Sequence, residues 1–191
     1  MPARHQYGFT LIELMVAVIV LVILTVIAVP SFTSYLDKAG VRGAADNVVN
    51  LIAQARQGGV KHDRDVNLAI TGVDDTWCVG ANQAVDPAAG SLSPGAVACD
   101  CTDTTECIVD NERLVVASSG HPGVTLTSPA GGITFDGRLG VRSDANTADV
   151  DASSFDLTSK SGRFVLTVNV SPLGQATVCS KSGNILGYPQ C

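Results

Sequence analysis

The feature that most constrains this chain is an uninterrupted apolar run from Phe9 to Val29. The run is 21 residues long, fifteen of its side chains are Leu, Ile, Val or Phe, and Glu13 is its only ionisable residue. A helix rises about 1.5 Å per residue, so a helix of this length matches the hydrocarbon core of a bilayer. Glu13 lies near one end, where a charge costs less than the roughly 2.5–3.5 kcal/mol it costs at the centre. The run is therefore predicted to be a membrane-spanning helix.

Two other structures contain apolar runs, a cleaved secretory signal peptide and a buried helix of a soluble protein. A signal peptide has an apolar stretch of about 7–15 residues followed by a small-residue cleavage site, and this run fits neither feature. A buried helix is rarely apolar on every face over such a length. The residues before the run include Arg4 and His5, whereas the sequence after it is long and acidic. The positive-inside rule therefore predicts that the short N-terminal segment is cytoplasmic and that the rest lies outside the cytoplasm.

An amphipathic continuation of the helix is predicted over residues 30–57. Apolar or small side chains recur there with helical spacing, at Val41, Ala44, Ala45, Val48, Ile52 and Ala55. One face of this segment is expected to pack on a globular head, and a short heptad coiled coil is the alternative. Gly58 and Gly59 are predicted to end the helix near residue 57.

Residues 58–191 are predicted to form a β head. Six segments alternate or run apolar with β-branched residues, namely 66–70, 114–117, 124–127, 132–137, 163–170 and 175–179. Turn signals separate these segments, and residues 80–106 are predicted to be a long loop. The expected fold class is therefore α+β, a long N-terminal helix packed on an antiparallel β head.

Six cysteines lie outside the apolar run, at Cys78, Cys99, Cys101, Cys107, Cys179 and Cys191. An even number of cysteines in an oxidising compartment favours disulfides. A zinc or iron–sulfur site is the alternative, but the cysteines lack paired C-x-x-C spacing. Cys179 and Cys191 bracket a polar turn and are predicted to pair. For the other four, Cys78–Cys99 with Cys101–Cys107 is the expected pairing among the alternatives that the sequence leaves open.

Neither catalysis nor a bound cofactor is expected. The sequence has no nucleophile elbow, phosphate-binding loop, zinc-protease motif or dinucleotide-binding motif, so the chain is expected not to be an enzyme. Asp144, Asn146, Asp149 and Asp151 could supply oxygen ligands to calcium. They lack the glycine and closing glutamate of an EF-hand, so a solvated acidic loop is expected there and no metal is assigned.

The residues Gly8–Glu13, which read GFTLIE, resemble the class III signal of type IV pilins and pseudopilins. The resemblance implies that prepilin peptidase cleaves after Gly8, removing residues 1–8, and N-methylates Phe9. It also implies that Glu13 stays in the membrane helix (residues 9–29) and pairs with the α-amino group of a neighbouring subunit. A carboxylate in lipid needs such a partner. Pro30 matches the proline at which this family kinks or locally melts the helix.

A second resemblance lies in the head and concerns the GspH/FimT class. It rests on Ile133–Gly140, on the apolar residues 165–168, on the Pro172–Gly174 turn and on Thr177–Cys179, although Leu139 interrupts the class's Gly-Arg-Gly pattern. The class implies a minor type IV pilin that helps to prime pilus assembly near the tip. Its implied partners are other minor and major pilins, prepilin peptidase and the inner-membrane assembly machinery. The implied location is the inner membrane, crossed once with the head in the periplasm, and then the pilus.

Two alternative functions are a minor pseudopilin of type II secretion and a DNA-binding pilin for natural transformation. Some FimT-type proteins bind DNA through a Gly-Arg-x-Arg motif in the C-terminal tail, but residues 180–191 hold one lysine and no arginine. Arg138 and Arg142 are then the only candidates for contacts with DNA. Phosphate binding needs several cations on one face, and the net charge of −6 disfavours DNA as a partner.

Overall fold

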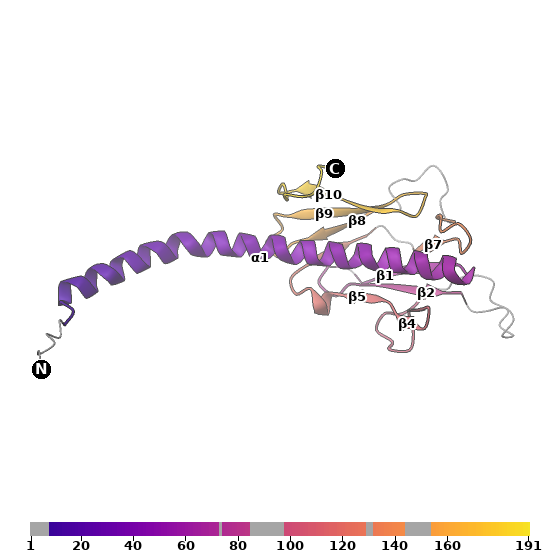
Figure 1. Cartoon of the computed structure of the whole chain (residues 1–191), viewed down its shortest axis with the longest axis horizontal. Coiled ribbons are helices and arrows are strands. Elements are labelled where there is room, and N and C mark those ends of the chain that lie inside the picture. Colours follow the sequence, from indigo (N-terminus) through magenta and orange to yellow (C-terminus); the bar gives the residue numbers. More distant parts are fainter. Residues whose placement is uncertain (1–7, 73, 85–97, 129–131, 144–153) are drawn as a thin grey trace, which may run out of the picture. The chain divides into compact units, whose positions relative to one another are not determined.

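The computed structural model describes residues 8–72, 74–84, 98–128, 132–143 and 154–191. The described residues contain one long helix, α1 (Leu11–His62), and ten short strands whose pairs are all antiparallel (Figure 1). The predicted α+β fold is confirmed and is of the type IV pilin-like kind. The chain divides into two compact units, one up to Leu36 and one from Asp37 onwards.

The second half of α1 supplies one wall of the core of the head. Its buried side chains are Val41, Ala44, Ala45, Val48, Leu51, Ile52 and Ala55. All six positions predicted from the helical spacing are among them, and each is fully buried. The amphipathic interpretation of this segment is therefore confirmed.

The predicted end of the helix near residue 57 is wrong, because α1 continues through Gly58 and Gly59 to His62. Both glycines stay helical and allow close packing. A β-carbon on Gly58 would overlap Val109, and one on Gly59 would lie 2.9 Å from the carbonyl oxygen of Arg64. These glycines therefore serve close approach rather than helix termination.

Two four-stranded sheets form the rest of the head. The first has the order β5 (Val115–Ala117), β2 (Cys78–Gln83), β1 (Val66–Thr71) and β7 (Ile133–Phe135). The second has the order β10 (Ala176–Ser182), β9 (Val165–Val170), β8 (Ser154–Thr158) and β6 (Thr125–Thr127). A small hairpin, β3 (Ile108–Val109) and β4 (Glu112–Arg113), and a 3-10 turn, η2 (Ser118–Gly120), complete the described elements.

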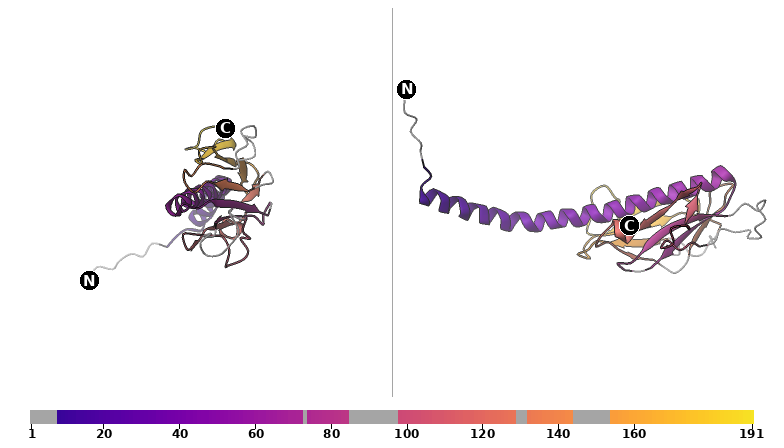
Figure 2. Two further views of the ribbon diagram at one scale, coloured as in Figure 1. Left: turned by 90° about the vertical axis from the view of Figure 1, so that its right-hand side faces the viewer. Right: turned by 90° about the horizontal axis from the view of Figure 1, so that it is seen from below.

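The two sheets are joined at a backbone bridge and share one core with the helix. Asp74 and Leu126 exchange two backbone hydrogen bonds of 3.2 and 3.1 Å, which link the turn after β1 to strand β6. In the head, α1 runs along one side of the strands of both sheets (Figure 2). Leu68, Phe135 and Phe155 are among the large side chains buried between them.

The strand predictions were largely confirmed, with three omissions. Each of the six predicted segments contains a strand. Strand β2 was missed because it was assigned to the predicted loop 80–106, and this part of the loop prediction is wrong. Strand β8 and the β3–β4 hairpin were also missed, the hairpin because each strand has only two residues and carries no periodic signal. Residues 85–97 of the predicted loop lie outside the described residues.

Candidate functional site

The predicted processing motif lies at the very start of α1. Gly8, Phe9 and Thr10 are exposed and precede the helix. The Thr10 hydroxyl oxygen accepts a 3.3 Å hydrogen bond from the backbone N–H of Glu13, and the Thr10 carbonyl accepts one of 3.2 Å from Leu14. Thr10 is therefore the N-cap, and Thr-x-x-Glu is the pattern of a capping box. The Gly8–Phe9 peptide bond lies outside the helix, and both residues are exposed.

The apolar half of α1 is not covered by any other part of the chain that the structure describes. Every side chain from Phe9 to Val29 is exposed, and the helix is long and apolar enough to cross a membrane. Ala17, Val20, Leu21, Leu24, Thr25 and Ala28 line a shallow apolar groove along it. The Thr25 hydroxyl donates to the Val22 carbonyl at 2.8 Å, so it leaves no unmet donor on this surface. Helices pack closely in a membrane where small residues of this kind occur.

Pro30 does not interrupt the helix. Helix α1 is continuous from Leu11 to His62, and Pro30 lies inside that span. The kink or local melting that the family resemblance implies at Pro30 stays a prediction.

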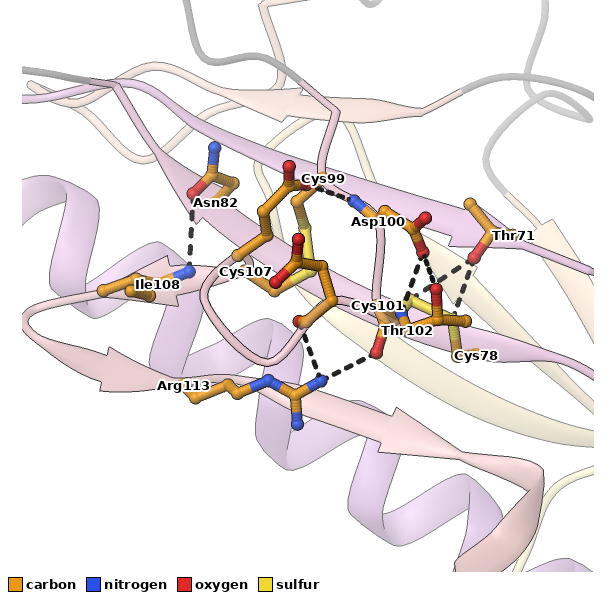
Figure 3. The surroundings of a disulfide bond; sticks show 12 residues. Thr71, Cys78, Asn82, Cys99, Asp100, Cys101, Thr102, Cys107, Ile108 and Arg113 are labelled. Atoms are coloured by element: carbon orange, nitrogen blue, oxygen red, sulfur yellow. Dashed lines mark hydrogen bonds between the residues drawn. A yellow bond between two sulfur atoms is a disulfide. The ribbon is translucent and has the colours of Figure 1, made fainter.

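Three disulfides are present, and one of the three predicted pairs is correct. Cys179–Cys191 forms as expected, with 5.0 Å between the Cα atoms. The expected pairs Cys78–Cys99 and Cys101–Cys107 are wrong. The structure instead joins Cys78 to Cys101 and Cys99 to Cys107, with Cα–Cα distances of 6.2 and 5.3 Å (Figure 3). All six sulfur atoms are thus bonded to sulfur, and none is a thiolate available to a metal.

The two central disulfides form a second, smaller core. Side chains alternate across a strand, so Val79 and Ala81 of β2 face the main core while Cys78 and Gly80 face the other side. The buried members of this second cluster are Ala69, Cys78, Cys99, Cys101 and Cys107. The disulfides therefore cover the outer face of the first sheet, opposite the face that contributes to the main core.

The loop between Cys99 and Cys107 is held by its own hydrogen bonds. The Thr102 and Thr105 hydroxyls donate to the carboxylates of Asp100 and Asp103, each at 2.7 Å, and these bonds lower the pKa of both aspartates. Among the described residues, no group of three or more His, Cys, Asp or Glu side chains could hold a metal ion. Residues 144–151, which include the side chains considered as calcium ligands, lie outside the described residues.

The two arginines considered for DNA binding lie in very different surroundings. Arg142 is 8% exposed, and its guanidinium donates a 3.3 Å hydrogen bond to the Val170 carbonyl, so it is withdrawn from the surface. Arg138 is exposed and lies 3.5 Å from a carboxylate oxygen of Asp63. The structure therefore does not bring the two guanidinium groups together into a phosphate-binding patch.

The turn that carries Arg138 is a packing element. The Asp136 carboxylate accepts hydrogen bonds from the backbone N–H groups of Arg138 and Leu139 at 3.0 and 2.8 Å. The Gly140 carbonyl accepts a 2.7 Å bond from Arg56 of α1. A β-carbon on Gly137 would overlap the backbone of Arg64. The segment that resembles the GspH/FimT class thus anchors the end of α1 to the sheet.

Sequence reasoning missed two contacts that dock loops on α1. Asp110 of the β3–β4 turn accepts from Lys61 and from His62, each at 2.6 Å, and these bonds hold the pKa of Asp110 below its usual value. Tyr188, inside the Cys179–Cys191 loop, donates to Asp46 at 2.9 Å. Burial, with a smaller contribution from that bond, raises the pKa of Tyr188. Both contacts join residues far apart in the sequence, so no local pattern could have indicated them.

Comparison with known proteins finds one matching family model and one similar curated protein. The family model of the prokaryotic N-terminal methylation motif matches residues 3–29. The chain is also similar to competence protein ComGC of Halalkalibacterium halodurans, with 38% identity over 63 residues, which are 33% of this chain and 62% of that protein. The chain thus spans less than two thirds of the length of this curated relative.

No solved structure matches the chain. The matched motif and the apolar helix fit a membrane-anchored protein whose head lies outside the cytoplasm. A motif of this kind implies assembly with other pilins and processing by the corresponding machinery. The chain thus carries the N-terminal methylation motif of prokaryotic pilin-like proteins.

Proposed function

We propose that this chain is a minor type IV pilin, a structural subunit without a catalytic role that helps to prime pilus assembly near the tip. In this proposal prepilin peptidase cleaves after Gly8 and methylates Phe9. Residues 9–29 hold the subunit in the inner membrane until it enters the filament. The methylation motif supports the processing step. The resemblance of the head to the GspH/FimT class supports the minor-pilin role.

The observation that carries the proposal is that every side chain from Phe9 to Val29 is exposed. A folded chain does not leave so large an apolar surface in water, because each buried Leu, Ile or Val side chain contributes about 1.5–3 kcal/mol. Lipid can cover this surface before assembly, and the same helices of neighbouring subunits can cover it afterwards. A subunit that moves from a bilayer into a helical bundle needs such a surface.

Glu13 gives the assembly step its specificity in this proposal. It is the only ionisable residue between Phe9 and Val29, in the first turn of α1. An unpartnered carboxylate in an apolar environment is costly. Cleavage after Gly8 creates an ammonium group at Phe9, and a subunit whose ammonium group reaches Glu13 removes that cost. The charge therefore favours docking in one register.

DNA uptake is the second candidate function, because the similar protein from Halalkalibacterium halodurans is named a competence protein. The burial of Arg142 and the proximity of Asp63 to Arg138 weigh against it. Binding of duplex DNA by the purified chain at low salt, lost in Arg138→Ala, would support this candidate. If the chain does not shift the electrophoretic mobility of duplex DNA at low salt, the DNA-uptake candidate is removed.

The experiment that tests the main proposal is a count of surface pili by electron microscopy in a deletion strain. The strain is complemented with the wild-type chain, with Glu13→Ala, or with the control Glu112→Ala, whose side chain is exposed on β4. We expect loss of pili in the deletion, and recovery with the wild type and with Glu112→Ala but not with Glu13→Ala. The same count in a retraction-deficient background separates assembly from stability. Normal piliation in the deletion strain would contradict the priming role and favour DNA uptake or type II secretion.

A further inference from the structure

The four central cysteines are paired in an interleaved order. Along the chain they follow as Cys78, Cys99, Cys101 and Cys107, and the structure joins the first to the third and the second to the fourth. The sequence separations are 23 and 8 residues. Cys179–Cys191, by contrast, joins two consecutive cysteines. The chain thus contains both consecutive and interleaved disulfides. The consecutive Cys179–Cys191 bond serves as a control for the formation of the two interleaved bonds.

Chain entropy in the unfolded state does not select the interleaved pairing. The consecutive alternative, Cys78–Cys99 with Cys101–Cys107, closes loops of 21 and 6 residues. Loop closure becomes less probable as about the 3/2 power of loop length, so the consecutive pairing is favoured roughly two-fold. A chain oxidised before it folds is therefore expected to hold at least as much of the wrong pairing as of the right one.

Contacts of the folded sheet select the native pairing. The Thr71 hydroxyl of β1 lies 2.8 Å from Cys78 Sγ and 3.4 Å from Cys101 Sγ, which places this pair over one end of β1 (Figure 3). A β-carbon on Gly80 would lie 2.5 Å from Cys107 Sγ and 3.2 Å from Cys99 Sγ. It would also lie 3.3 Å from Cys101 Sγ. Both disulfides therefore gather around one glycine of β2, within reach of each other for exchange.

Arg113 holds the Cys101 segment from outside the Cys99–Cys107 loop. One guanidinium nitrogen of Arg113, on β4, donates to the carbonyls of Cys101 and Asp103 at 2.7 and 3.2 Å (Figure 3). Strand β4 pairs with β3, which begins directly after Cys107. These bonds therefore tie the Cys101 segment to the β3–β4 hairpin, so they belong to the folded arrangement and not to an unfolded chain.

We propose that the native pairing is reached by thiol–disulfide isomerisation, and that Arg113 is its positioning residue. A thiolate of an external thiol catalyst attacks Cys107 in the Cys101–Cys107 bond, forms a mixed disulfide and releases the Cys101 thiolate. The Cys101 thiolate attacks Cys78 and releases the Cys99 thiolate. The Cys99 thiolate then attacks Cys107 in the mixed disulfide and releases the catalyst. Two disulfides break, two form, and no net oxidation occurs.

The test uses the full chain in detergent micelles, unfolded and reduced, and then oxidised with diamide in the absence of thiols. Cleavage before aspartate places each central cysteine on its own peptide, within residues 75–85, 86–99, 100–102 and 103–109. Mass spectrometry then counts native and consecutive pairings. We expect diamide alone to give the consecutive pairing at least as often as the native one, while Cys179–Cys191 forms throughout. Adding reduced and oxidised glutathione is expected to raise the native fraction at least two-fold.

A second measurement needs no refolding and isolates the role of Arg113. Connectivity is mapped in the purified chain carrying Arg113→Met, with Arg138→Met as the matched control because Arg138 is exposed and far from the cysteines in sequence. We expect the consecutive pairing to rise several-fold in Arg113→Met and not in the control. Cys179–Cys191 is expected to remain intact in both.

Two results would overturn the proposal. One is native pairing in most molecules after diamide alone, which would show that folding precedes oxidation. The other is persistence of the consecutive pairing as the main form with glutathione present. Identical connectivity in Arg113→Met and in the wild type would remove the positioning role of Arg113.

Discussion

The two halves of α1 contain similar apolar residues but differ in what covers them. Ile19, in the first half, is 56% exposed, whereas Ile52, in the second half, is fully buried against the sheets. In the proposed function, lipid or other subunits cover the first half, so its apolar surface is buried only on membrane insertion or on assembly. The second half is covered by the chain itself and stabilises the head directly. One helix thus joins a surface for other molecules to a wall of an internal core.

The largest expected effect compares these two isoleucines. Ile52→Ala should lower the free energy of unfolding of the head by about 2–5 kcal/mol, because it leaves a cavity between helix and sheets. Ile19→Ala, the matched control, should leave that value unchanged. Denaturant unfolding in micelles can be followed by the fluorescence of Trp77, the only tryptophan, which is buried in the same core. Equal losses in the two variants would contradict the division of α1.

The next effect concerns the disulfides, which lie only in the head. Replacing Cys78 and Cys101 together with serine opens a loop of 23 residues, and should lower the free energy of unfolding by about 2–4 kcal/mol. The same replacement of Cys179 and Cys191, 12 residues apart, should cost somewhat less in the chain-entropy model. The unfolding midpoints of both double variants measure the difference. A larger loss for the C-terminal pair would show that its docking on α1 outweighs the loop length.

A smaller effect tests the close packing of the disulfides on the outer face of the sheet. Gly80→Ala places a methyl group 2.5 Å from Cys107 Sγ, and should cost about 1–3 kcal/mol of stability through overpacking. Gly120→Ala is the control, because among the described residues no atom beyond its two chain neighbours lies within 4 Å of the added methyl group. The midpoint of Gly120→Ala should match the wild type. An unchanged midpoint for Gly80→Ala would mean that the cystine cluster can move away from the sheet.

The smallest effect is a pH dependence at the far end of α1. Bonds from Lys61 and His62 lower the pKa of Asp110 in the folded state, so its stabilising contribution exists above the unfolded pKa, about 4. It is lost as the pH falls through the lower, folded pKa. The difference in stability between Asp110→Asn and the wild type should therefore shrink as the pH falls below the unfolded pKa of the carboxyl group and through its lowered pKa in the folded state.

Glu112→Gln is the control for this titration, because it removes a charge from the same hairpin without breaking the contacts of Asp110. Thermal unfolding of the three chains across the pH range makes the comparison. A difference for Asp110→Asn that does not depend on pH would assign the contact to packing rather than to charge.

Local patterns were sufficient to predict the helix and most strands. The spacing of Val41, Val48 and Ile52 identified the buried face, because a helix places residues three or four apart on one side. The Cys179–Cys191 pair was also predicted correctly, because the two cysteines bracket a short polar turn. The glycines at 58 and 59 misled the prediction, because local propensity cannot reveal that Val109 and Val66 pack closely against them.

The sequence by itself determined the apolar span, the N-terminal methylation motif within residues 3–29, the amphipathic face of α1 and the α+β class. Each of these depends on residues near one another in the chain. Only the tertiary structure decided the pairing of the four central cysteines, the burial of Arg142 and the docking of Asp110 and Tyr188 on the helix. The physical reason is that strand register and side-chain packing bring these groups together, and neither leaves a periodic signal along the chain.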